Sequence, residues 1–373
     1  MPGALSPVSV DTVELHRVAL PLLSPWDTAH GSFDVREVVL VHVVGAHTDG
    51  WGECSALPYE GYAGGSIDRA HRALRDDLAP RLLDSPASDV SPPAGADTPP
   101  TARFAIECAL IDAALKDRGT ALAEYLGGTR DAVAAGAALG LGDTVSTAAA
   151  ARAAAVAGYR RVKCKIAPGR DLAVVDTVRS EIGADVFLGA DANGAYASTD
   201  AANRNTLEEL DARGLDFLEQ PVAADDLEGL ADLSAALRTP VALDESAASL
   251  ESTRAALDAG AGNAVSVKAP RLGGLLEAVR IHDLCRERNV TVLAGGMLET
   301  GVGRAAAVAL ASLPGFTHPG DLAASDRYFA EDVTEPFELR DGCLSVPDGP
   351  GLGVAPLPAT MRRHTLSVET LTR

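Results

Sequence analysis

The sequence predicts an α/β fold in which a closed (β/α) barrel of parallel strands is covered by an α+β domain. After residue 128, short apolar runs such as "VFLGADA" and "VTVLAGG" alternate with Ala-rich helical stretches. Polar residues end most of these runs at spacings of 24 to 28 residues, about the length of one βα unit. The first third of the chain differs, with β-rich segments followed by helical ones. We therefore expect a capping domain at 1–128, a barrel at 129–330 and a tail at 331–373 that returns to the capping domain.

The sequence of the first 128 residues predicts strands that are followed by helices. Segments rich in β-branched side chains indicate strands at 8–20, 35–45 and 48–54, with a "TDG" turn before the third. Helical patterns follow at about 66–80 and 101–117. Between them, "DSPASDVSPPAGADTPP" is rich in Pro, Ser and Ala and predicts a flexible loop.

Two capping segments are suited to closing over a bound ligand. They are 24–33 ("SPWDTAHGSF") and 55–65 ("SALPYEGYAGG"), both predicted as loops that contain glycine and aromatic residues. The alternative is that both are ordinary surface turns. We expect His30 to pack or form hydrogen bonds rather than to act as a catalyst, and Glu299 to hold its own loop in place.

Five polar residues end successive apolar runs of the barrel segment. In chain order they are Lys165, Asp191, Glu219, Asp244 and Lys268. A doubly wound sheet divides consecutive strand ends across a switch point, whereas a closed barrel gathers them around one mouth. The regular spacing therefore favours a barrel with its chemistry at that mouth. Beyond the barrel, "EPFELRDGCLSVPDGPGLGV" predicts a hairpin that returns to the capping domain.

Composition argues against several classes of function. A formal net charge of −20 disfavours nucleic acid or an anionic membrane surface as a partner. No basic start followed by an apolar run is visible, and no run of about 18 apolar residues occurs, so we expect neither a signal peptide nor a membrane span. The cysteines are dispersed and form no C-x-x-C pair, which indicates reduced thiols in a cytoplasmic protein. They are Cys54, Cys108, Cys164, Cys285 and Cys343.

Asp191, Glu219 and Asp244 predict a metal site. Three carboxylates that converge in a barrel mouth repel one another unless a cation lies between them. Ligation by oxygen alone suits Mg²⁺, which keeps positions open for water and a substrate anion, and Mn²⁺ is expected to substitute for it. The alternative is that each acid caps a helix or pairs with an arginine. Because the three acids recur at the spacing of one βα unit, the interpretation as a metal site is favoured.

Lysine is so rare in this chain that its positions are informative. Only four of the 32 Lys and Arg residues are lysines, namely Lys116, Lys163, Lys165 and Lys268. Arginine keeps its proton, whereas a lysine can be tuned to lose one near neutral pH. Residues two apart on a strand point to the same side, so Lys163 and Lys165 should both project into the barrel and depress at least one pKa. Lys268 would approach from the opposite side of the mouth. Solvated surface lysines are the alternative.

In this order, the motifs "KCK", "DAN", "EQP", "DES", "VKAPRLGG" and "GGMLETGVGR" resemble the enolase superfamily. Within it, the chain is similar to the o-succinylbenzoate synthase and N-succinylamino acid racemase group of the muconate-cycloisomerase-like branch. The resemblance extends over effectively the whole chain and rests on the ordered set, since a single motif such as "DAN" is weak. It implies a modified (β/α)8 barrel, written (β/α)7β, under an α+β capping domain.

The resemblance also implies a metal site and its supports. Asp191, Glu219 and Asp244 would hold Mg²⁺. Asn193 and Glu245 would lie behind these ligands and orient them.

Catalytic and substrate-binding residues follow from the same resemblance. Lys165 and Lys268 would be the acid/base groups on the two faces of the substrate, and Lys163 would support Lys165. The expected substrate contacts are Lys163, Arg271, Gly296 and Met297. Arg271 matches an arginine typical of members with racemase activity, although this chain has "KAPR" where the group usually shows "KPGR".

The activity implied is a Mg²⁺-dependent dehydration of 2-succinyl-6-hydroxy-2,4-cyclohexadiene-1-carboxylate to 2-succinylbenzoate, a step of menaquinone biosynthesis. Lys165 would remove the proton α to the carboxylate, and the metal would stabilise the resulting enediolate. Lys268 would mainly stabilise the anion by a cation–π contact. The alternative is racemisation of N-succinylamino acids, in which the two lysines exchange roles on opposite faces.

Other readings fit less well. A muconate-type cycloisomerase shares the lysines and acids. A dipeptide epimerase usually carries a second acid where this chain has Ala323 after Asp321. A catalytically inactive metal-binding scaffold would keep the fold without the activity. In each enzymatic reading we expect a small carboxylate as substrate and a homo-oligomeric assembly.

Overall fold

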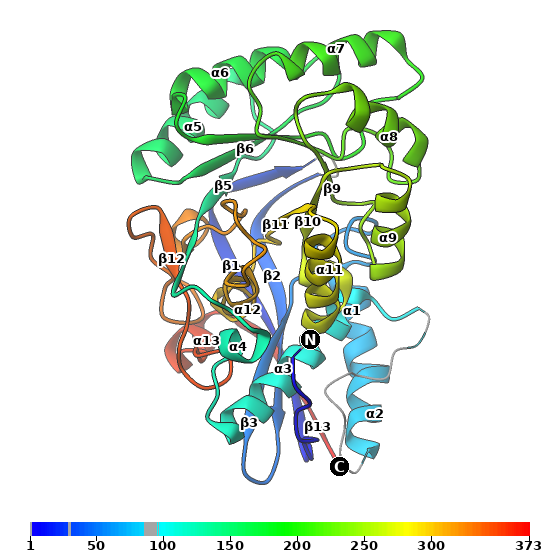
Figure 1. The fold of residues 1–373 in the computed structure, drawn as a ribbon. Coiled ribbons are helices and arrows are strands. Elements are labelled where there is room, and N and C mark those ends of the chain that lie inside the picture. Colours follow the sequence, from blue (N-terminus) through cyan, green and yellow to red (C-terminus); the bar gives the residue numbers. More distant parts are fainter. Residues whose placement is uncertain (1, 29–30, 86–94, 96) are drawn as a thin grey trace.

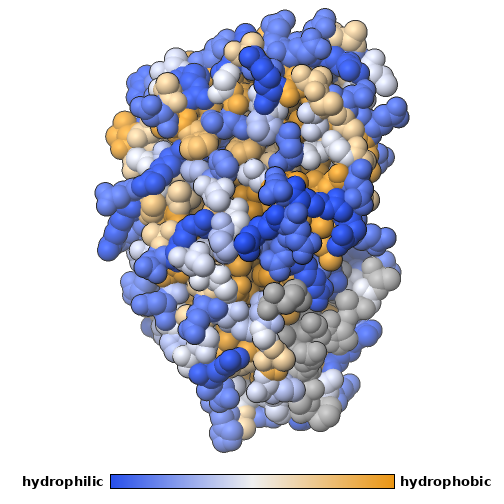
Figure 2. All heavy atoms as spheres, in the orientation of Figure 1, coloured by the Kyte–Doolittle hydropathy of each residue, from blue (hydrophilic) through white to orange (hydrophobic). Residues whose placement is uncertain are grey.

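The computed structural model describes residues 2–28, 31–85, 95 and 97–373. Figure 1 shows the long N-terminal strands (blue) running through the lower and central part of the molecule, with the helices of about residues 144–258 (green) above and to the right of them. Hydrophilic residues cover much of the face shown in Figure 2, with apolar residues scattered among them. None of the helices in the described ranges combines the length and the apolar character that a bilayer span requires.

The capping domain is built on a four-stranded antiparallel sheet with the strand order β13-β1-β2-β3. The strands are β1 (Thr12–Thr28), β2 (Gly31–Val44), β3 (Asp49–Cys54) and β13 (Thr365–Thr372). Alternate residues such as Val13 and Leu15 face inward and are fully buried. Helix α3 (Pro100–Arg118) packs so closely on β3 that a Cβ on Gly50 would lie 2.0 Å from the Ala109 carbonyl oxygen. This close approach requires glycine at that position.

The two helices predicted in this domain are present. The first, expected at 66–80, consists of three consecutive segments that continue to Asp84, and α3 is the second. The three segments are α1 (Ile67–Ala73), the π-helix η1 (Leu74–Leu78) and α2 (Ala79–Asp84). The short helix α4 (Leu122–Leu126) follows α3.

The segment 24–33 differs from the predicted loop. In its described part, β1 and β2 continue as a hairpin in which Trp26 pairs with Phe33. Cross-strand pairing of this kind stabilises antiparallel strands, and local composition does not reveal it. The hairpin reaches the barrel, where Leu141 N donates to the Asp27 carbonyl oxygen at 3.0 Å.

The segment 55–65 contains neither a helix nor a named strand, as predicted. Ile67 N donates to the Leu57 carbonyl oxygen at 2.8 Å and ties the start of this loop to α1. His30 lies outside the described residues, so its predicted role stays a prediction. The loop "DSPASDVSPPAGADTPP" also lies largely outside them.

Seven parallel strands form the barrel wall in the order β11-β10-β9-β8-β7-β6-β5. They are β5 (Gly136–Ala138), β6 (Arg161–Lys165), β7 (Phe187–Asp191), β8 (Phe217–Glu219), β9 (Val241–Leu243), β10 (Ala264–Val267) and β11 (Thr291–Ala294). Residues 320–322 bridge the two edges of this wall. Asp321 N donates to the Ala294 carbonyl oxygen at 2.7 Å, and Gly136 N donates to the Leu322 carbonyl oxygen at 3.3 Å. The predicted (β/α)7β barrel is therefore confirmed.

Helices surround this barrel wall (Figure 1). They are α5 (Thr144–Ala157), α6 (Leu172–Ile182), α7 (Ala201–Asp211), α8 (Leu227–Ala236), α9 (Leu250–Asp258), α10 (Ala269–Leu272), α11 (Leu275–Glu287) and α12 (Gly301–Ala311), with a 3-10 turn η2 (Ser325–Arg327) beyond them. Several begin at an aspartate whose side chain accepts from the backbone of the first turn, for example Asp143 before α5, Asp200 before α7 and Asp226 before α8. These capping aspartates are distinct from the acids that end the strands.

The tail contacts the barrel segment and α3 before its last strand joins the capping sheet. Strand β12 (Cys343–Ser345) of the predicted hairpin pairs with β4 (Ala132–Ala134), which directly precedes the first barrel strand. The chain then contacts α3, where Leu352 N donates to Asp112 Oδ1 at 2.7 Å. After α13 (Pro358–His364), β13 pairs with β1 and completes the capping sheet. The boundaries at residues 128 and 330 stay predictions.

Candidate active site at the barrel mouth

The barrel strands bring the predicted lysines and acids into one mouth. In chain order these are Lys163 and Lys165 on β6, Asp191 on β7, Glu219 on β8, Asp244 after β9 and Lys268 after β10. The strand register places Lys165 beside Asp191, and Asp191 beside Glu219. Lys165 is half-buried and the other five are buried, so solvent screens their charges little.

Lys163 is surrounded by carboxylates. Its Nζ lies 3.0 Å from both Glu219 oxygens, 3.3 Å from Asp191 Oδ2 and 2.6 Å from Asp321 Oδ2. The neighbouring Lys165 donates to Asp191 Oδ2 at 2.7 Å. Asp191 and Glu219 therefore pair with lysines and do not cap helices.

Lys268 enters from the other side of the mouth. Its Nζ lies 2.6 Å from Asp244 Oδ2 and 3.5 Å from Glu219 Oε1. The Tyr62 hydroxyl of the capping loop donates to Asp244 Oδ2 at 2.7 Å and accepts from Lys268 at 2.5 Å. Three strands separate β6 from β10 in the barrel wall, so Lys165 and Lys268 face each other across the mouth.

Further side chains support the acids from behind. Arg271 Nη2 lies 2.9 Å from Asp244 Oδ1 and also donates to the Asp244 carbonyl oxygen. Asn193 accepts from Lys165 at 2.5 Å and donates to Glu245 Oε1 at 2.8 Å. These contacts are the kind that a supporting role for Asn193 and Glu245 requires.

Electrostatics keep two of the acids ionised despite their burial. Burial raises the pKa of Asp191, but Lys165 and Lys163 outweigh it and bring the pKa well below its ordinary value. Burial acts in the same way on Asp244, whose pKa is nevertheless lowered to about 2, chiefly by Arg271. Neighbouring cations therefore match the charges of Asp191 and Asp244.

The pKa of Lys163 corrects one prediction. Burial lowers this pKa, but Asp321 and Glu219 raise it more strongly, and the net result lies well above the ordinary lysine value. Repulsion between the ammonium groups of Lys163 and Lys165 had predicted a depressed pKa for at least one of them. For Lys163 that expectation was wrong, because the surrounding acids outweigh both burial and the repulsion from Lys268.

The donor chemistry of the mouth fits a hard divalent cation. Asp191, Glu219 and Asp244 offer oxygen ligands, are at most 1% exposed, and include one atom, Asp244 Oδ1, that makes no well-formed hydrogen bond. Within the described residues, however, the three acids do not form a group whose ligand atoms all lie within 4.8 Å of one another. The ammonium groups of Lys163 and Lys268 lie among them and balance their charge.

A cavity of about 890 Å³, counted with its opening to solvent, adjoins these charges. Its charged and polar end includes Lys163, Lys165, Asp191, Asn193 and Lys268. Apolar and aromatic residues from both domains make much of the remaining wall, among them Trp26, Leu57, Tyr59, Met297, Leu298, Leu322 and Tyr328. The two capping segments thus contribute to the cavity wall and are more than surface turns. The cavity suits a carboxylate that carries a bulky apolar group.

Some of the residues predicted to contact the substrate line the cavity, and one does not. Gly296 and Met297 line the cavity, and Met297 N donates to Glu299 Oε1 at 2.7 Å, so Glu299 holds this loop as predicted. Arg271 is 5% exposed and lies behind Asp244 rather than in the cavity wall. Its predicted contact with substrate stays a prediction.

Sequence reasoning missed two residues of the mouth. Asp321 lies 53 residues after Lys268, which is two steps of the same spacing, so the period itself could have indicated it. Tyr62 comes from the capping loop, 206 residues away from its partner Lys268, and no spacing rule indicates it.

Two family models match the chain. Residues 11–127 match the mandelate racemase / muconate lactonizing enzyme N-terminal domain. Residues 146–360, more than half of the chain, match the enolase C-terminal domain-like family. The chain therefore belongs to the enolase superfamily.

Named relatives extend over nearly its whole length. An N-succinylamino acid racemase from Amycolatopsis sp. is 44% identical over 362 residues, which are 95% of this chain and 96% of that protein. An o-succinylbenzoate synthase from Geobacillus kaustophilus is 40% identical over 353 residues, 93% of each. A solved enolase superfamily member from Listeria innocua has a TM-score of 0.90 at 31% identity and covers 98% of this chain and 99% of that one. The chain is similar to enzymes of both names, as its motifs predicted.

Proposed function

We propose that this protein is an o-succinylbenzoate synthase, which dehydrates 2-succinyl-6-hydroxy-2,4-cyclohexadiene-1-carboxylate to 2-succinylbenzoate in menaquinone biosynthesis. One observation carries the proposal. Three of only four lysines in the chain line the charged end of one cavity, where they pair with the buried carboxylates of Asp191, Glu219 and Asp244. The relatives named o-succinylbenzoate synthase support this choice of reaction.

Asp191, Glu219 and Asp244 are the residues that would hold Mg²⁺, and Mn²⁺ would substitute for it. A bound Mg²⁺ would supply electrostatic stabilisation for the negative charge that develops on the substrate carboxylate. Asn193 and Glu245 keep the site oriented through their mutual hydrogen bond and the contact of Asn193 with Lys165.

Lys165, as the neutral amine, removes the proton from the carbon next to the carboxylate. The C–H electron pair becomes part of the new aromatic ring, the C–O bond breaks, and the leaving hydroxide takes the proton back from Lys165 as water. Lys268 remains protonated across the mouth and stabilises the anion. Lys163 binds the substrate carboxylate, and the aromatic wall of the cavity excludes water from the reacting carbon.

Racemisation of N-succinylamino acids is the second candidate, since the two reactions share the proton-abstraction step. It is favoured by the 44% identity to the Amycolatopsis racemase and by the approach of Lys165 and Lys268 from opposite sides of the mouth. In this reaction one lysine removes the α-proton and the other delivers a proton to the opposite face. Gly296, Met297 and Arg271 would then influence which N-acyl group is accepted.

The remaining readings are less well supported. Residue 323, where a dipeptide epimerase carries a second acid, is a buried alanine. We further propose a cytoplasmic location and a homo-oligomeric assembly that uses a small carboxylate as substrate.

The test is a paired assay of the purified protein with Mg²⁺. One half follows 2-succinylbenzoate formation, and the other follows loss of optical rotation of N-succinyl phenylalanine and N-succinyl methionine. Dehydration much faster than racemisation supports the synthase, and comparable rates support a bifunctional enzyme. If neither reaction proceeds and no α-hydrogen exchanges even with Mg²⁺ bound, the proposal is wrong.

A further inference from the structure

A second group of potential metal ligands lies on the capping sheet. Glu14 and His16 are two residues apart on β1 and share a face of the sheet, and His42 on β2 is the cross-strand partner of Glu14. The partner of His16 on β13 is Val368, which is 51% exposed, so this face is open to solvent. Strand pairing alone therefore brings an acid and two histidines together on the outer surface.

Their ligand atoms are already close. Glu14 Oε2 lies 3.1 Å from His16 Nε2 and 3.0 Å from His42 Nδ1, and one ligand atom from each residue lies within 4.8 Å of the others. In the described part of the chain, this is the one group of three or more Asp, Glu, His or Cys residues that meets this distance. Its side chains are only partly exposed, at 32% for Glu14, 15% for His16 and 17% for His42.

The surroundings of His42 fix its ring plane and place a carboxylate beside each of its ring nitrogens. The ring stacks on Trp51 with centroids 4.0 Å apart and planes 8° apart. Its Nε2 lies 3.1 Å from Asp49 Oδ2, which in turn is 3.5 Å from Lys116 Nζ. When Nε2–H donates to Asp49, the lone pair of Nδ1 points to the Glu14 side. A carboxylate on the far nitrogen of a histidine is the usual outer support of a metal-binding imidazole.

We propose that Glu14, His16 and His42 bind a divalent cation of the zinc class, at a site separate from the barrel mouth. Two imidazole nitrogens with one carboxylate oxygen suit Zn²⁺, Ni²⁺ or Cu²⁺, whereas Mg²⁺ prefers oxygen ligands alone. Three protein ligands leave a fourth position for water on the open side of the sheet. The bound ion takes the place of the direct contacts between the two histidines and Glu14 and crosslinks β1 to β2.

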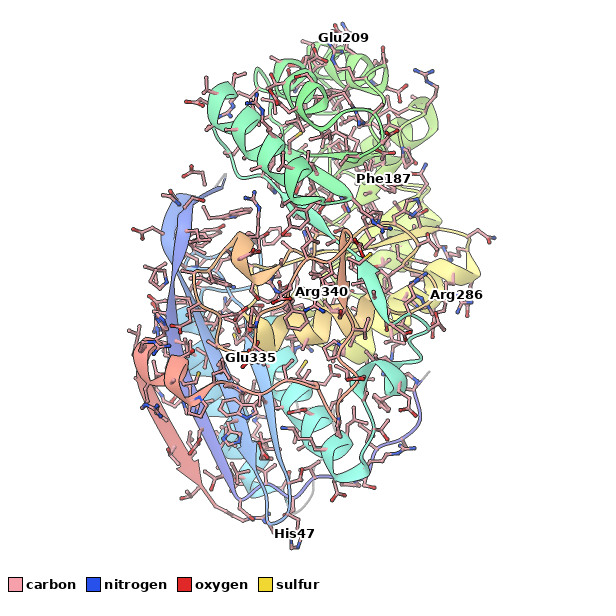
Figure 3. All side chains as sticks on the ribbon, turned by 90° about the vertical axis from the view of Figure 1, so that its left-hand side faces the viewer. His47, Phe187, Glu209, Arg286, Glu335 and Arg340 are labelled. Carbon is pink, nitrogen blue, oxygen red and sulfur yellow. The ribbon has the colours of Figure 1, made fainter. Side chains whose placement is uncertain are left out.

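The first test measures Zn²⁺ binding to the untagged protein by titration calorimetry, in excess Mg²⁺ to occupy the oxygen site. We expect one Zn²⁺ per chain. His16→Gln and His42→Gln should each weaken binding at least about tenfold, and Asp49→Asn should weaken it by about ten- to a hundredfold. The matched control is His47→Gln, at an exposed histidine that Figure 3 shows at the far tip of the same domain. Its affinity should equal that of the wild type.

The second test locates the ion. The chain has two tryptophans, so Trp26→Phe leaves Trp51, stacked on His42, as the fluorescent group. Stoichiometric Cu²⁺ should quench its fluorescence, and His42→Gln should abolish the quenching. The proposal would be overturned if the wild type bound Zn²⁺ with no higher affinity than the His16→Gln/His42→Gln double variant. Equal loss of affinity in His47→Gln, or Cu²⁺ binding without quenching of Trp51, would also overturn it.

Discussion

The barrel mouth and the outer face of the capping sheet both gather ionisable side chains, but they differ in burial. Asp191, Glu219 and Asp244 are at most 1% exposed, whereas the side chain of Glu14 is 32% exposed. In the mouth every charge depends on its partners, because removing one partner leaves a buried charge unpaired. On the outer face, solvent screens each charge. Substitutions in the mouth should therefore affect stability and activity together, and those on the sheet should affect chiefly metal binding.

The largest effect is expected at Lys165. Lys165→Ala removes the proposed base and should lower kcat for dehydration by about 10³-fold, within the usual range for general acid–base catalysis. Steady-state kinetics with Mg²⁺ measure the loss. The matched control is Lys116→Arg, at the one lysine outside the mouth. The arginine retains a positive charge beside Asp112, with which Lys116 forms an ion pair. A Lys165→Ala enzyme with more than about a tenth of wild-type kcat would contradict the role of Lys165.

The next largest effect is expected in the free energy of unfolding, which should fall more for a substitution in the mouth than for one on the outer face. Lys163→Met leaves Glu219 and Asp321 without their closest cation and should lower the free energy of unfolding by about 3 kcal/mol in the metal-free protein. His16→Gln on the outer face should lower it by less than about 1 kcal/mol. Urea denaturation of both variants in EDTA provides the measurement. Equal losses would mean that burial does not distinguish the two regions.

Arg36 connects the two domains at the cavity. Its buried guanidinium donates to the carbonyl oxygens of Ser55, Ala56, Met297 and Leu298 at 2.5 to 3.0 Å. Arg36→Lys keeps the positive charge, but one ammonium group cannot donate to all four carbonyl oxygens at once. We therefore expect the free energy of unfolding to fall by about 2 kcal/mol and KM to rise. Unchanged stability and KM would show that the two loops are positioned without Arg36.

A further effect concerns the pH dependence of stability. Burial raises the pKa of Glu53 from 4.5 to about 7, although this carboxylate accepts from Thr300 N and Gly303 N at the start of α12. Between these pH values the folded protein holds a proton that the unfolded chain has lost, so this group makes stability fall as pH rises.

Glu53→Gln removes this dependence. The variant should lose less stability than the wild type between about pH 4.5 and pH 7, by at most about 3 kcal/mol. Denaturation at several pH values measures the difference, and Glu335→Gln, at an exposed glutamate labelled in Figure 3, serves as the control. Parallel pH profiles for Glu53→Gln and the wild type would contradict the raised pKa.

The sequence predicted the strand-end residues because the βα period fixes where each strand meets the mouth. Asp191, Glu219 and Lys268 follow from that period, and the scarcity of lysine set Lys165 apart from arginines used only for charge. The period extends to Asp321 as well, although the sequence analysis used that residue only to argue against an epimerase.

The features that the sequence did not predict depend on contacts between distant segments of the chain. Tyr62 joins Lys268 and Asp244 only when the capping loop packs over the barrel. The direction of the Lys163 pKa depends on how many carboxylates surround it in three dimensions. The hairpin at 24–33 depends on cross-strand pairing and docking on the barrel, which local composition does not reveal.

The claim common to both candidate reactions is that Lys165 and Lys268 lie on opposite faces of one substrate carbon. The most direct measurement is deuterium uptake from heavy water at the α-carbon of N-succinyl-L-phenylalanine and, separately, its D-enantiomer. The wild type with Mg²⁺ should exchange both enantiomers. Lys165→Ala and Lys268→Ala should each exchange only one, and not the same one. Exchange of both enantiomers by either variant, or of the same enantiomer by both, would contradict the assignment of the two lysines to opposite faces.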